Sequence, residues 1–453
     1  MANKDKKKKK KPNKDVIKAI LILYIIIAIM PFVSALTHIT NCTQLQEMNI
    51  DLSENYVLDN NIDCSDTINW NGGEGFIPVG NGSFAFTGSI DGQGYNVSDI
   101  YINTMGDTRD YIGMIGYAED FIIQNIGIIN GTLNVTNAGS GILVGSGGGN
   151  DYINNSFVTG NIYGNGAEES FLVGGLLGFE QGFLIIENSW ANVNIYDVTV
   201  ESGILTGTLD EGNVTDCYAR GYIKGTELIG GLIADSYNIN IQGSYFEGII
   251  EATGQGVGGL IGWIGSPSTV SDSYAKGNVT CDSECGGLIG LSEGQITNTY
   301  SNVLVMNSTS TAIGGLTGSS TGTCNDSYWN TETSEQSTSA CGDGKTITEL
   351  QTISTFTNWD FENIWNLPVD EYPCLLWQEG CFTEIEEEEE IQPLYRYSPL
   401  YQSISSIGQG IGIFLQTIAI PLGILILLIG VVVALVHLLK DMDFLRSIMN
   451  IGI

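Results

Sequence analysis

The chain has 453 residues, of which 51 are Asp or Glu and 17 are Lys or Arg, so its formal net charge is −34. Nine of the basic residues lie within the first 18 positions, and the span 36–410 carries only six basic residues against 47 acidic ones, a net charge of −41. Because phosphate binding requires Lys and Arg, this composition excludes nucleic acid as a natural partner. It suits a solvated surface, cations, high salt or a basic partner.

Residues 1–35 have the composition of an export signal. A Lys-rich head is followed by a short apolar run over 19–32 and by small residues at 33–35. This order predicts a secretory signal peptide. An uncleaved N-terminal anchor is the alternative, although the apolar run is short for a membrane span. With either, the lysines stay in the cytoplasm and the following residues are exported.

Residues 36–111 show no repeat. They hold short apolar runs bounded by Gly or Asn. An uncapped solenoid exposes a strand edge and its core. We therefore predict that this segment forms an N-terminal solenoid cap.

Residues 112–330 repeat a short glycine motif eight times. The clearest copy is V-G-G-L-I-G at 257–262, and the copies end at 116, 145, 178, 207, 234, 262, 290 and 318, in steps of 27–33 residues. About ten residues after most copies comes a polar residue and then an aromatic one, as in S-Y-A at 273–275. Copies at a nearly fixed step predict a repeat architecture.

The complete unit reads G-G-L-I-G, a polar turn and then N-S-Y-A-x-G-x-V. It resembles the GLUG repeat of bacterial and archaeal surface proteins. The resemblance covers roughly residues 109–330, with D-G-Q-G-Y ahead of the repeats at 91–95 and S-Y-W-N-T-E-T behind them at 327–333. It implies a surface protein of the adhesin-like kind.

The fold expected from the residues alone is all-β. Each unit holds two or three strand-length apolar runs separated by Gly, Asn, Asp and Ser, and no sustained helical period crosses the repeats. We predict a parallel β-helix or β-solenoid of about eight coils of about 28 residues, because one unit cannot close its own core. The paired glycines are expected at tight corners with positive φ.

The repeat also predicts which side chains stack from coil to coil. One inward ladder is expected from the leucines Leu176, Leu232, Leu260, Leu288 and Leu316. A second row is expected from the tyrosines Tyr245, Tyr274, Tyr300 and Tyr328.

The remaining segments lead to the membrane. Residues 331–383 are aperiodic, and their tryptophans Trp359, Trp365 and Trp377 are expected to close the far end of the solenoid. Residues 384–410 begin with an acidic run and are predicted to be a stalk and juxtamembrane linker. The apolar run within 411–439 exceeds the roughly 20 residues that cross a bilayer, so we expect a single transmembrane helix, with a buried core helix as the alternative. Residues 440–453 would form a cytoplasmic tail.

Nine cysteines in an exported chain predict disulfides. Neighbours in the sequence suggest the pairs Cys42–Cys64, Cys281–Cys285, Cys324–Cys341 and Cys374–Cys381. Cys217 is left over and occupies the serine position of the repeat motif, so we expect a buried thiol there. Zinc binding is disfavoured because Cys-x-x-x-Cys without a nearby His is poor zinc spacing.

An exported chain also permits N-glycosylation. Ten N-x-S/T sequons provide candidate sites, at Asn41, Asn81, Asn96, Asn130, Asn134, Asn154, Asn213, Asn278, Asn307 and Asn325.

The residues leave little room for catalysis. The two histidines are His38, beside the expected cleavage point, and His437, in the expected membrane helix, so nucleophilic triads are excluded from the ectodomain. Glycoside hydrolysis by paired carboxylates is the chemistry that stays open. Its candidates are repeat-phased acids that could align on one face: Asp235, Glu247, Asp272 and Glu284.

No catalytic, cofactor or metal site is assigned, although calcium is left open because oxygen ligands are plentiful. The stretch G-G-G-N-D at 147–151 is only similar to the calcium-binding β-roll motif.

We therefore expect a non-enzymatic, single-pass cell-surface protein, anchored in the bilayer by its C-terminal helix. It would present a solenoid to cells, matrix or glycans, with a glycan or a surface protein as its partner. A surface polysaccharide hydrolase and a purely structural envelope or virion spike component are the alternatives.

Overall fold

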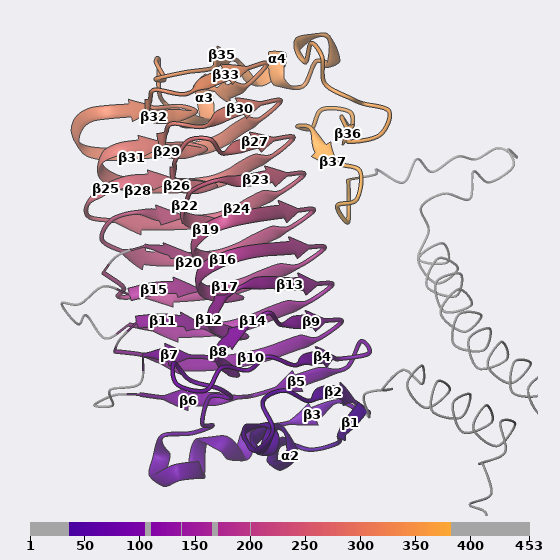
Figure 1. Ribbon diagram of the computed structural model, residues 1–453. Coiled ribbons are helices and arrows are strands. Elements are labelled where there is room, and N and C mark those ends of the chain that lie inside the picture. The colour runs from indigo at the N-terminus through magenta and orange to yellow at the C-terminus, as the bar shows by residue number, and fades with distance from the viewer. Residues whose placement is uncertain (1–35, 105–109, 137, 165–170, 200, 382–453) are drawn as a thin grey trace, which may run out of the picture. The chain divides into compact units, whose positions relative to one another are not determined.

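The computed structural model describes residues 36–381 apart from 105–109, 137, 165–170 and 200. The described chain is an all-β solenoid of about eight turns (Figure 1). The expected signal segment, acidic stalk, transmembrane helix and cytoplasmic tail all lie outside the described residues. Within the described residues, no helix is both long and apolar enough to span a bilayer.

Two large sheets with parallel pairing run along the solenoid. Sheet A has 17 strands: β1 (Leu36–Ile39), β2 (Asn55–Leu58), β4 (Ser89–Asp91), β8 (Ile115–Glu119), β9 (Ile122–Gln124), β12 (Val144–Gly148), β13 (Asn150–Asn154), β16 (Leu177–Glu187), β19 (Thr206–Thr215), β22 (Ile233–Ser236), β23 (Ile239–Gln242), β26 (Ile261–Ile264), β27 (Thr269–Ser271), β29 (Ile289–Ser292), β30 (Gln295–Thr297), β32 (Thr317–Ser320) and β33 (Thr323–Asn325).

Sheet B has 18 strands: β3 (Ile62–Asp63), β5 (Asn96–Ser98), β6 (Tyr101–Asn103), β7 (Tyr111–Ile112), β10 (Gly127–Asn134), β11 (Ala138–Gly141), β14 (Phe157–Tyr163), β15 (Phe171–Gly174), β17 (Trp190–Tyr196), β18 (Ser202–Gly203), β20 (Tyr218–Gly225), β21 (Ile229–Gly230), β24 (Tyr245–Ala252), β25 (Gln255–Gly258), β28 (Tyr274–Gly286), β31 (Tyr300–Gly314), β34 (Tyr328–Asn330) and β35 (Asp343–Lys345). A separate antiparallel pair joins β36 (Trp365–Asn366) to β37 (Cys374–Leu375).

The predicted leucine ladder is confirmed. Leu176, Leu232, Leu260, Leu288 and Leu316 are all 0% exposed and belong to one continuous core. Each coil also bonds to the next through its backbone, since Leu232 N–H donates to Leu260 O at 2.8 Å and Leu260 N–H donates to Leu288 O at 2.7 Å. The sequence repeat therefore corresponds to one turn of the solenoid.

The paired glycines serve close packing, so the expectation of positive-φ corners at these positions is wrong. Gly258 and Gly259 are absent from the residues with left-handed φ. A Cβ at Gly258 would lie 2.0 Å from Ile261 O, and one at Gly259 would lie 2.2 Å from Gly287 O in the next coil. Any larger residue would push these backbones apart, which explains why the motif requires glycine.

The left-handed corners are formed instead by the residue before the serine of the motif. One such residue per coil has φ between 46° and 60°, in the row Asn155, Asn188, Asp216, Gly243, Asp272, Asn298 and Asp326. Asn, Asp and Gly tolerate this conformation better than other residues do. We call these seven positions the corner row.

The serine after each corner links neighbouring coils. Ser244 N–H donates to Ser273 Oγ at 3.1 Å, and Ser273 Oγ donates to Ser271 O at 2.6 Å. Cys217 occupies the same position, and its thiol donates to Thr215 O at 3.2 Å. The motif serine thus forms buried hydrogen bonds that link neighbouring coils, and Cys217 takes its place in one coil.

The N-terminal segment already contributes strands to the stack, since β2 pairs with β4 and β3 pairs with β5. It contains α2 (Cys42–Glu47), η1 (Met48–Ile50) and η2 (Ser65–Gly73), and the Cys42–Cys64 disulfide joins α2 to the residue that precedes η2. Asn41 caps α2 by accepting a hydrogen bond from Gln44 N–H at 3.0 Å.

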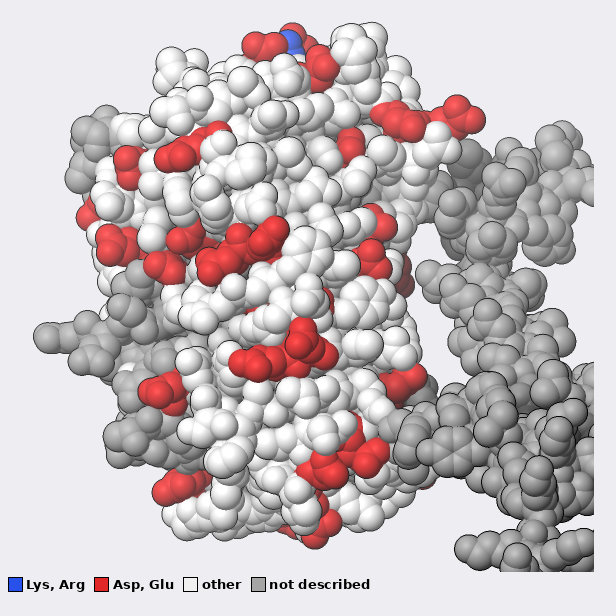
Figure 2. Space-filling view, viewed as in Figure 1, with Lys and Arg blue, Asp and Glu red and all other residues white. Residues whose placement is uncertain are grey.

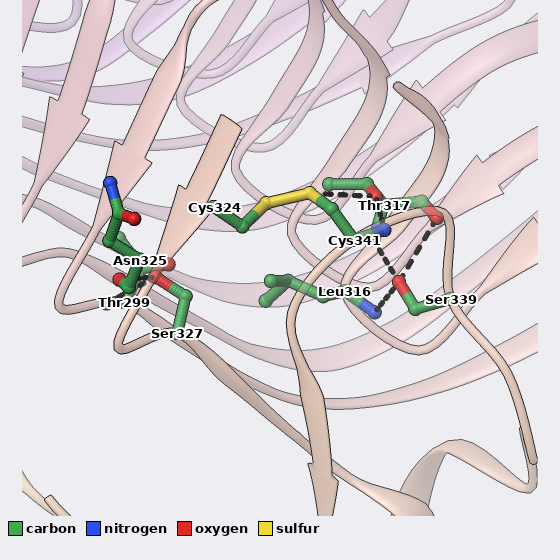
Figure 3. The surroundings of a disulfide bond; sticks show 8 residues. All are labelled: Thr299, Leu316, Thr317, Cys324, Asn325, Ser327, Ser339 and Cys341. Atoms are coloured by element: carbon green, nitrogen blue, oxygen red, sulfur yellow. Dashed lines mark hydrogen bonds between the residues drawn. A yellow bond between two sulfur atoms is a disulfide. The ribbon is translucent and has the colours of Figure 1, made fainter. Parts of the chain in front are cut away.

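The last coil is closed by residues 329–345, which include α3 (Thr331–Ser334) and β35. Ser339 Oγ accepts hydrogen bonds from Leu316 N–H at 3.2 Å and Thr317 N–H at 2.9 Å, as Figure 3 shows beside the Cys324–Cys341 disulfide. These bonds satisfy backbone donors that no further coil can satisfy. The chain continues through α4 (Ile347–Leu350) and η3 (Ile353–Thr355).

The three tryptophans do not close the end of the solenoid, so that expectation is wrong. Residues 356–381, which we call the flap, turn back and lie beside the coils; Figure 1 shows β36 and β37 next to the stack. Trp359 and Trp365 pack in a cluster with the tyrosine row that is separate from the solenoid core. The flap therefore covers an outer face of the solenoid, and residues 329–345 supply the cap.

The structure joins the cysteines in the four expected pairs and leaves Cys217 as a buried free thiol. Burial raises the pKa of this thiol to about 12, so it stays protonated and unreactive in the native protein.

We expect a thiol reagent to label no cysteine in the native protein and one per chain after denaturation without reductant, at Cys217. Peptide mapping of the labelled site checks this. Labelling of any other cysteine would contradict the pairing.

Candidate binding groove

An aromatic ladder runs along the outer face of sheet B. Strand register places Phe157, Trp190, Tyr218, Tyr245, Tyr274 and Tyr300 at the same position of successive coils. Their rings stack with centroid distances of 4.4 to 5.4 Å. The predicted tyrosine row thus exists, extends over earlier coils, and lies outside the leucine core.

The flap is attached to the corner row. Each of its three indole N–H groups donates to a different corner: Trp359 to Asp326 O at 2.8 Å, Trp365 to Asp272 Oδ1 at 3.3 Å and Trp377 to Gly243 O at 3.1 Å. A buried indole needs such a partner. The flap therefore descends the solenoid with one tryptophan at each of three corner positions.

Two tyrosines of the ladder bond the flap directly. Tyr274 Oη donates to Gln378 Oε1 at 2.8 Å, and Tyr300 Oη donates to Pro373 O at 2.6 Å. Burial raises the pKa of both hydroxyls well above the ordinary value, so they remain donors at neutral pH. The Cys374–Cys381 disulfide closes the loop that carries Gln378 and begins directly after Pro373.

A groove of about 310 Å³ lies between the flap and sheet B. Sheet B contributes Glu247, Tyr274, Lys276 and Tyr300, and the flap contributes Pro368, Glu371, Tyr372, Pro373, Cys374, Gln378, Glu379, Gly380 and Cys381. The lining combines aromatic rings with carboxylates, an ammonium group and an amide. Such a mixture is typical of a site for a polar organic ligand.

Basic residues concentrate on this face. Figure 2 shows Asp and Glu dispersed in small groups over the visible surface, with very little Lys or Arg. The described residues contain four Lys or Arg side chains, and all four lie on strands of sheet B with their side chains outside the core: Arg220, Lys224, Lys276 and Lys345. The outer face of sheet B is thus less negative than the composition implies.

Register brings opposite charges together beside the ladder. Arg220 pairs with Glu247 and Glu247 pairs with Lys276 on successive strands. Arg220 Nη2 lies 3.0 Å from Glu247 Oε2, and its guanidinium lies 5.1 Å from the Tyr218 ring centroid. Lys276 is exposed at the groove. Its ammonium group is therefore available to a ligand.

The four repeat-phased acids do not form an aligned catalytic row. Asp235 lies on β22 of sheet A, Glu247 on β24 of sheet B, and Asp272 at a left-handed corner, while Glu284 has φ 54° within β28. Each acid therefore lies at a different position within its coil, and the four side chains do not stack above one another. Of the four, only Glu247 lines the groove.

The glycine-rich stretch 147–151 ends in a buried acid. Asp151 is only 3% exposed and faces Glu180, which sequence reasoning did not single out. Within the described residues, no group of three or more His, Cys, Asp or Glu side chains is arranged to hold a metal ion. His38, at the N-terminal edge, lies 2.8 Å from Asp59 Oδ1.

Nine of the ten sequon asparagines have described side chains, and none of these is buried. Four of them, Asn41, Asn81, Asn130 and Asn325, are exposed, and the other five are partly buried. The tenth, Asn307, has a side chain outside the described set.

Comparison with known proteins gives similarities in sequence and in structure. No protein-family model matches the chain. Halomucin from Haloquadratum walsbyi (strain DSM 16790 / HBSQ001) is 35% identical over 158 residues, which cover 32% of this chain and 2% of Halomucin. The crystal structure of a protein described as a candidate immunoglobulin A1 protease from Bacteroides ovatus is 21% identical and covers 77% of this chain and 94% of that one, with a TM-score of 0.42.

Proposed function

We propose that this protein is an exported, surface-displayed solenoid that binds a glycan in the groove between the flap and sheet B. One observation carries the proposal: the groove brings together the aromatic ladder, two charged residues of sheet B and polar residues of the flap. The charged residues of sheet B are Glu247 and Lys276. Carboxylates accept hydrogen bonds from sugar hydroxyls, and Lys276 donates to sugar oxygens. Tyr372, the lining aromatic residue that is not buried, supplies apolar area with little loss of side-chain freedom.

Export is supported by the cysteines. Four disulfides close loops at both ends of the described chain and within the coils and flap. Disulfides persist in oxidising environments and are rare in the cytosol. The likeness to Halomucin and the solenoid fold are both compatible with a repeat protein of the cell surface.

The same proposal includes a cleaved signal over residues 1–35, a membrane helix over 411–439 and glycosylation at the sequons. The apolar composition of the two terminal segments supports the first two. It also includes membership of the repeats in the GLUG type, which the spacing and the N-S-Y-A-x-G-x-V pattern support. Together these features describe an adhesin-like protein with a C-terminal anchor.

The proposal is tested by measuring binding of the purified full chain and of Lys276→Ala to a glycan array, followed by titration of the best ligand. Because Lys276 is exposed at the groove, its removal should leave folding intact and weaken binding by about tenfold, which corresponds to about 1.4 kcal/mol. Thermal unfolding of the variant should match that of the wild type.

Lys224→Ala is the matched control. Lys224 lies on sheet B and is exposed, but it pairs with Asp197 at 2.8 Å and does not line the groove. Equal losses in both variants would mean that charge alone matters and would contradict a groove site. An array without any bound glycan would favour the structural envelope role, and release of reducing sugars would favour the hydrolase.

A further inference from the structure

Two acidic side chains lie inside the solenoid, away from the groove. Glu180 on β16 is 0% exposed and Asp151 on β13 is 3% exposed. The strand register shows which residues occupy the equivalent positions in the neighbouring coils. Glu180 pairs with Gly147 on one side and with the buried Leu209 on the other, and Asp151 pairs with the buried Leu184. Two carboxyl groups thus occupy places that neighbouring coils fill with leucine or leave empty.

Each carboxyl group has one oxygen held by the backbone. Phe121 N–H donates to Asp151 Oδ1 at 3.0 Å, and Gly182 N–H donates to Glu180 Oε1 at 2.7 Å. The other two oxygens, Asp151 Oδ2 and Glu180 Oε2, are buried and receive no donor from any other described residue. Buried polar atoms without partners are rare because their desolvation is uncompensated.

The two unsatisfied oxygens converge on one point. A Cβ at Gly147 would lie 2.0 Å from Glu180 Oε2 and 2.9 Å from Asp151 Oδ2. The carboxyl groups therefore meet in the space that a side chain at Gly147 would occupy. The stretch 147–151, which resembles a calcium loop in sequence, therefore has glycine at 147 because a side chain there would collide with the two carboxyl groups.

The surroundings give these groups no positive charge. Tyr117 and Glu119 come from β8, Asp120 follows it, and Asp210 and Glu211 come from β19. No Lys or Arg belongs to β8, β12, β13, β16 or β19, all of which the structure describes. Only a proton or a bound cation could relieve the repulsion between the two carboxylates.

A proton fits the pair better than a cation. Calcium takes six to eight oxygen ligands, whereas two side-chain oxygens converge here and the described residues contain no larger ligand group. We infer that Asp151 and Glu180 share a proton in an O–H···O hydrogen bond over Gly147, and that this bond is a pH-sensitive latch between the coils of β13 and β16. Loss of the proton leaves two facing carboxylates in the core and loosens these coils.

The direction of the effect follows from linkage. Burial raises the pKa of Glu180 to about 9 and that of Asp151 to about 7, above the values of about 4 expected in the unfolded chain. A group whose pKa is raised by folding stabilises the native state below its unfolded pKa, and this contribution is lost as pH rises through the folded pKa. The latch should therefore hold at neutral pH and open as pH rises toward 9.

Comparison of the full chain with Glu180→Gln tests the latch. The substituted glutamine keeps the size of the side chain and offers an amide donor to Asp151, but it does not titrate. Between pH 7 and 9 the wild-type unfolding constant should rise by up to tenfold per pH unit for each proton held, and the variant should lose that part of the slope. Chemical denaturation at fixed ionic strength measures both.

Glu211→Gln is the control, because Glu211 is exposed on the adjacent strand and the same carboxyl-to-amide substitution is made there. Its slope should equal that of the wild type, including the background from Asp235, whose pKa burial raises to about 7. Equal slopes in all three proteins would overturn the latch.

Carboxyl ¹³C titration of the wild type gives a readout that does not depend on folding of a variant. It should show two side-chain carboxyl groups that titrate together above pH 6. If calcium raises the stability at constant pH and ionic strength and removes the pH dependence, a cation and not a proton holds the two carboxylates together. That result would overturn the inference.

Discussion

Replacing Trp365 by alanine is expected to release the flap from sheet B while the coils stay folded. Trp365 is 0% exposed, and its ring centroid lies 4.4 Å from that of Trp359 and 6.1 Å from that of Tyr300. Truncating a buried tryptophan typically destabilises by about 3–5 kcal/mol. Phe356, Trp359 and Leu375 are the other buried side chains of this cluster in the flap, and Trp365 is the largest fully buried one, so its loss should be enough to release the flap.

Limited proteolysis followed by mass spectrometry measures the release. Cleavage should appear within residues 356–381, and hydrogen exchange should increase along the strands that carry Tyr274 and Tyr300. Circular dichroism should retain the β-sheet signal, since the leucine core is separate from the flap cluster. The groove should disappear with the flap, so glycan binding should be lost as well.

Val369→Ala supplies the comparison within the same segment, because Val369 is 82% exposed and its truncation removes no buried contact. Its proteolysis pattern should match that of the wild type. Trp365→Ala with wild-type protease resistance would show that the indole hydrogen bonds of Trp359 and Trp377 hold the flap without it.

The coils could be predicted from the sequence because the same residue pattern recurs in each of them. Leu260 is surrounded by equivalent leucines 28 residues away on each side, so a single motif specifies the inward face of many coils. The same logic gave the tyrosine row, since a side chain at a fixed phase stacks on its own equivalents. Spacing alone did not show which face of the sheet the tyrosines occupy.

The flap could not be predicted because it has no repeat. Trp359, Trp365 and Trp377 read as a compact end cap, and only their acceptors reveal the path along the solenoid. One signal in the sequence was available: Asp272 and Asp326 are acidic at positions where most other coils carry Asn or Gly. Both carboxylates bond the flap, since Asp272 Oδ1 accepts from the Trp365 indole and Asp326 Oδ2 accepts from the Asn358 amide.

The buried acid pair was missed for a related reason. Glu180 lies outside the glycine motif and follows it by two residues, where it reads as one acid among 51. Its burial follows from the absence of a side chain at Gly147 one coil away, a relation that depends on register. Local sequence rules failed where the chain departs from its own consensus, as is expected of sites with a special role.

Leu260→Ala should lower the free energy of unfolding by about 2–5 kcal/mol. Leu260 is 0% exposed, and its backbone bonds both Leu232 and Leu288, so the coil cannot easily move to fill the cavity. In a solenoid the stability is a sum of coil and interface contributions between neighbours. A cavity in the middle should therefore weaken both adjoining interfaces and allow the two halves to unfold separately.

Denaturant unfolding monitored by hydrogen exchange on each coil tests this expectation. The variant should show a second transition, with protection lost first in the strands next to Leu260. Ile249→Ala is the matched control, because Ile249 lies on the outer face of the preceding coil and is 43% exposed, so its truncation should change stability by only about 0.5 kcal/mol. A loss below about 1 kcal/mol for Leu260→Ala would mean that the coils collapse into the cavity. The leucine ladder would then be a consequence of stacking and would contribute little to holding the coils together.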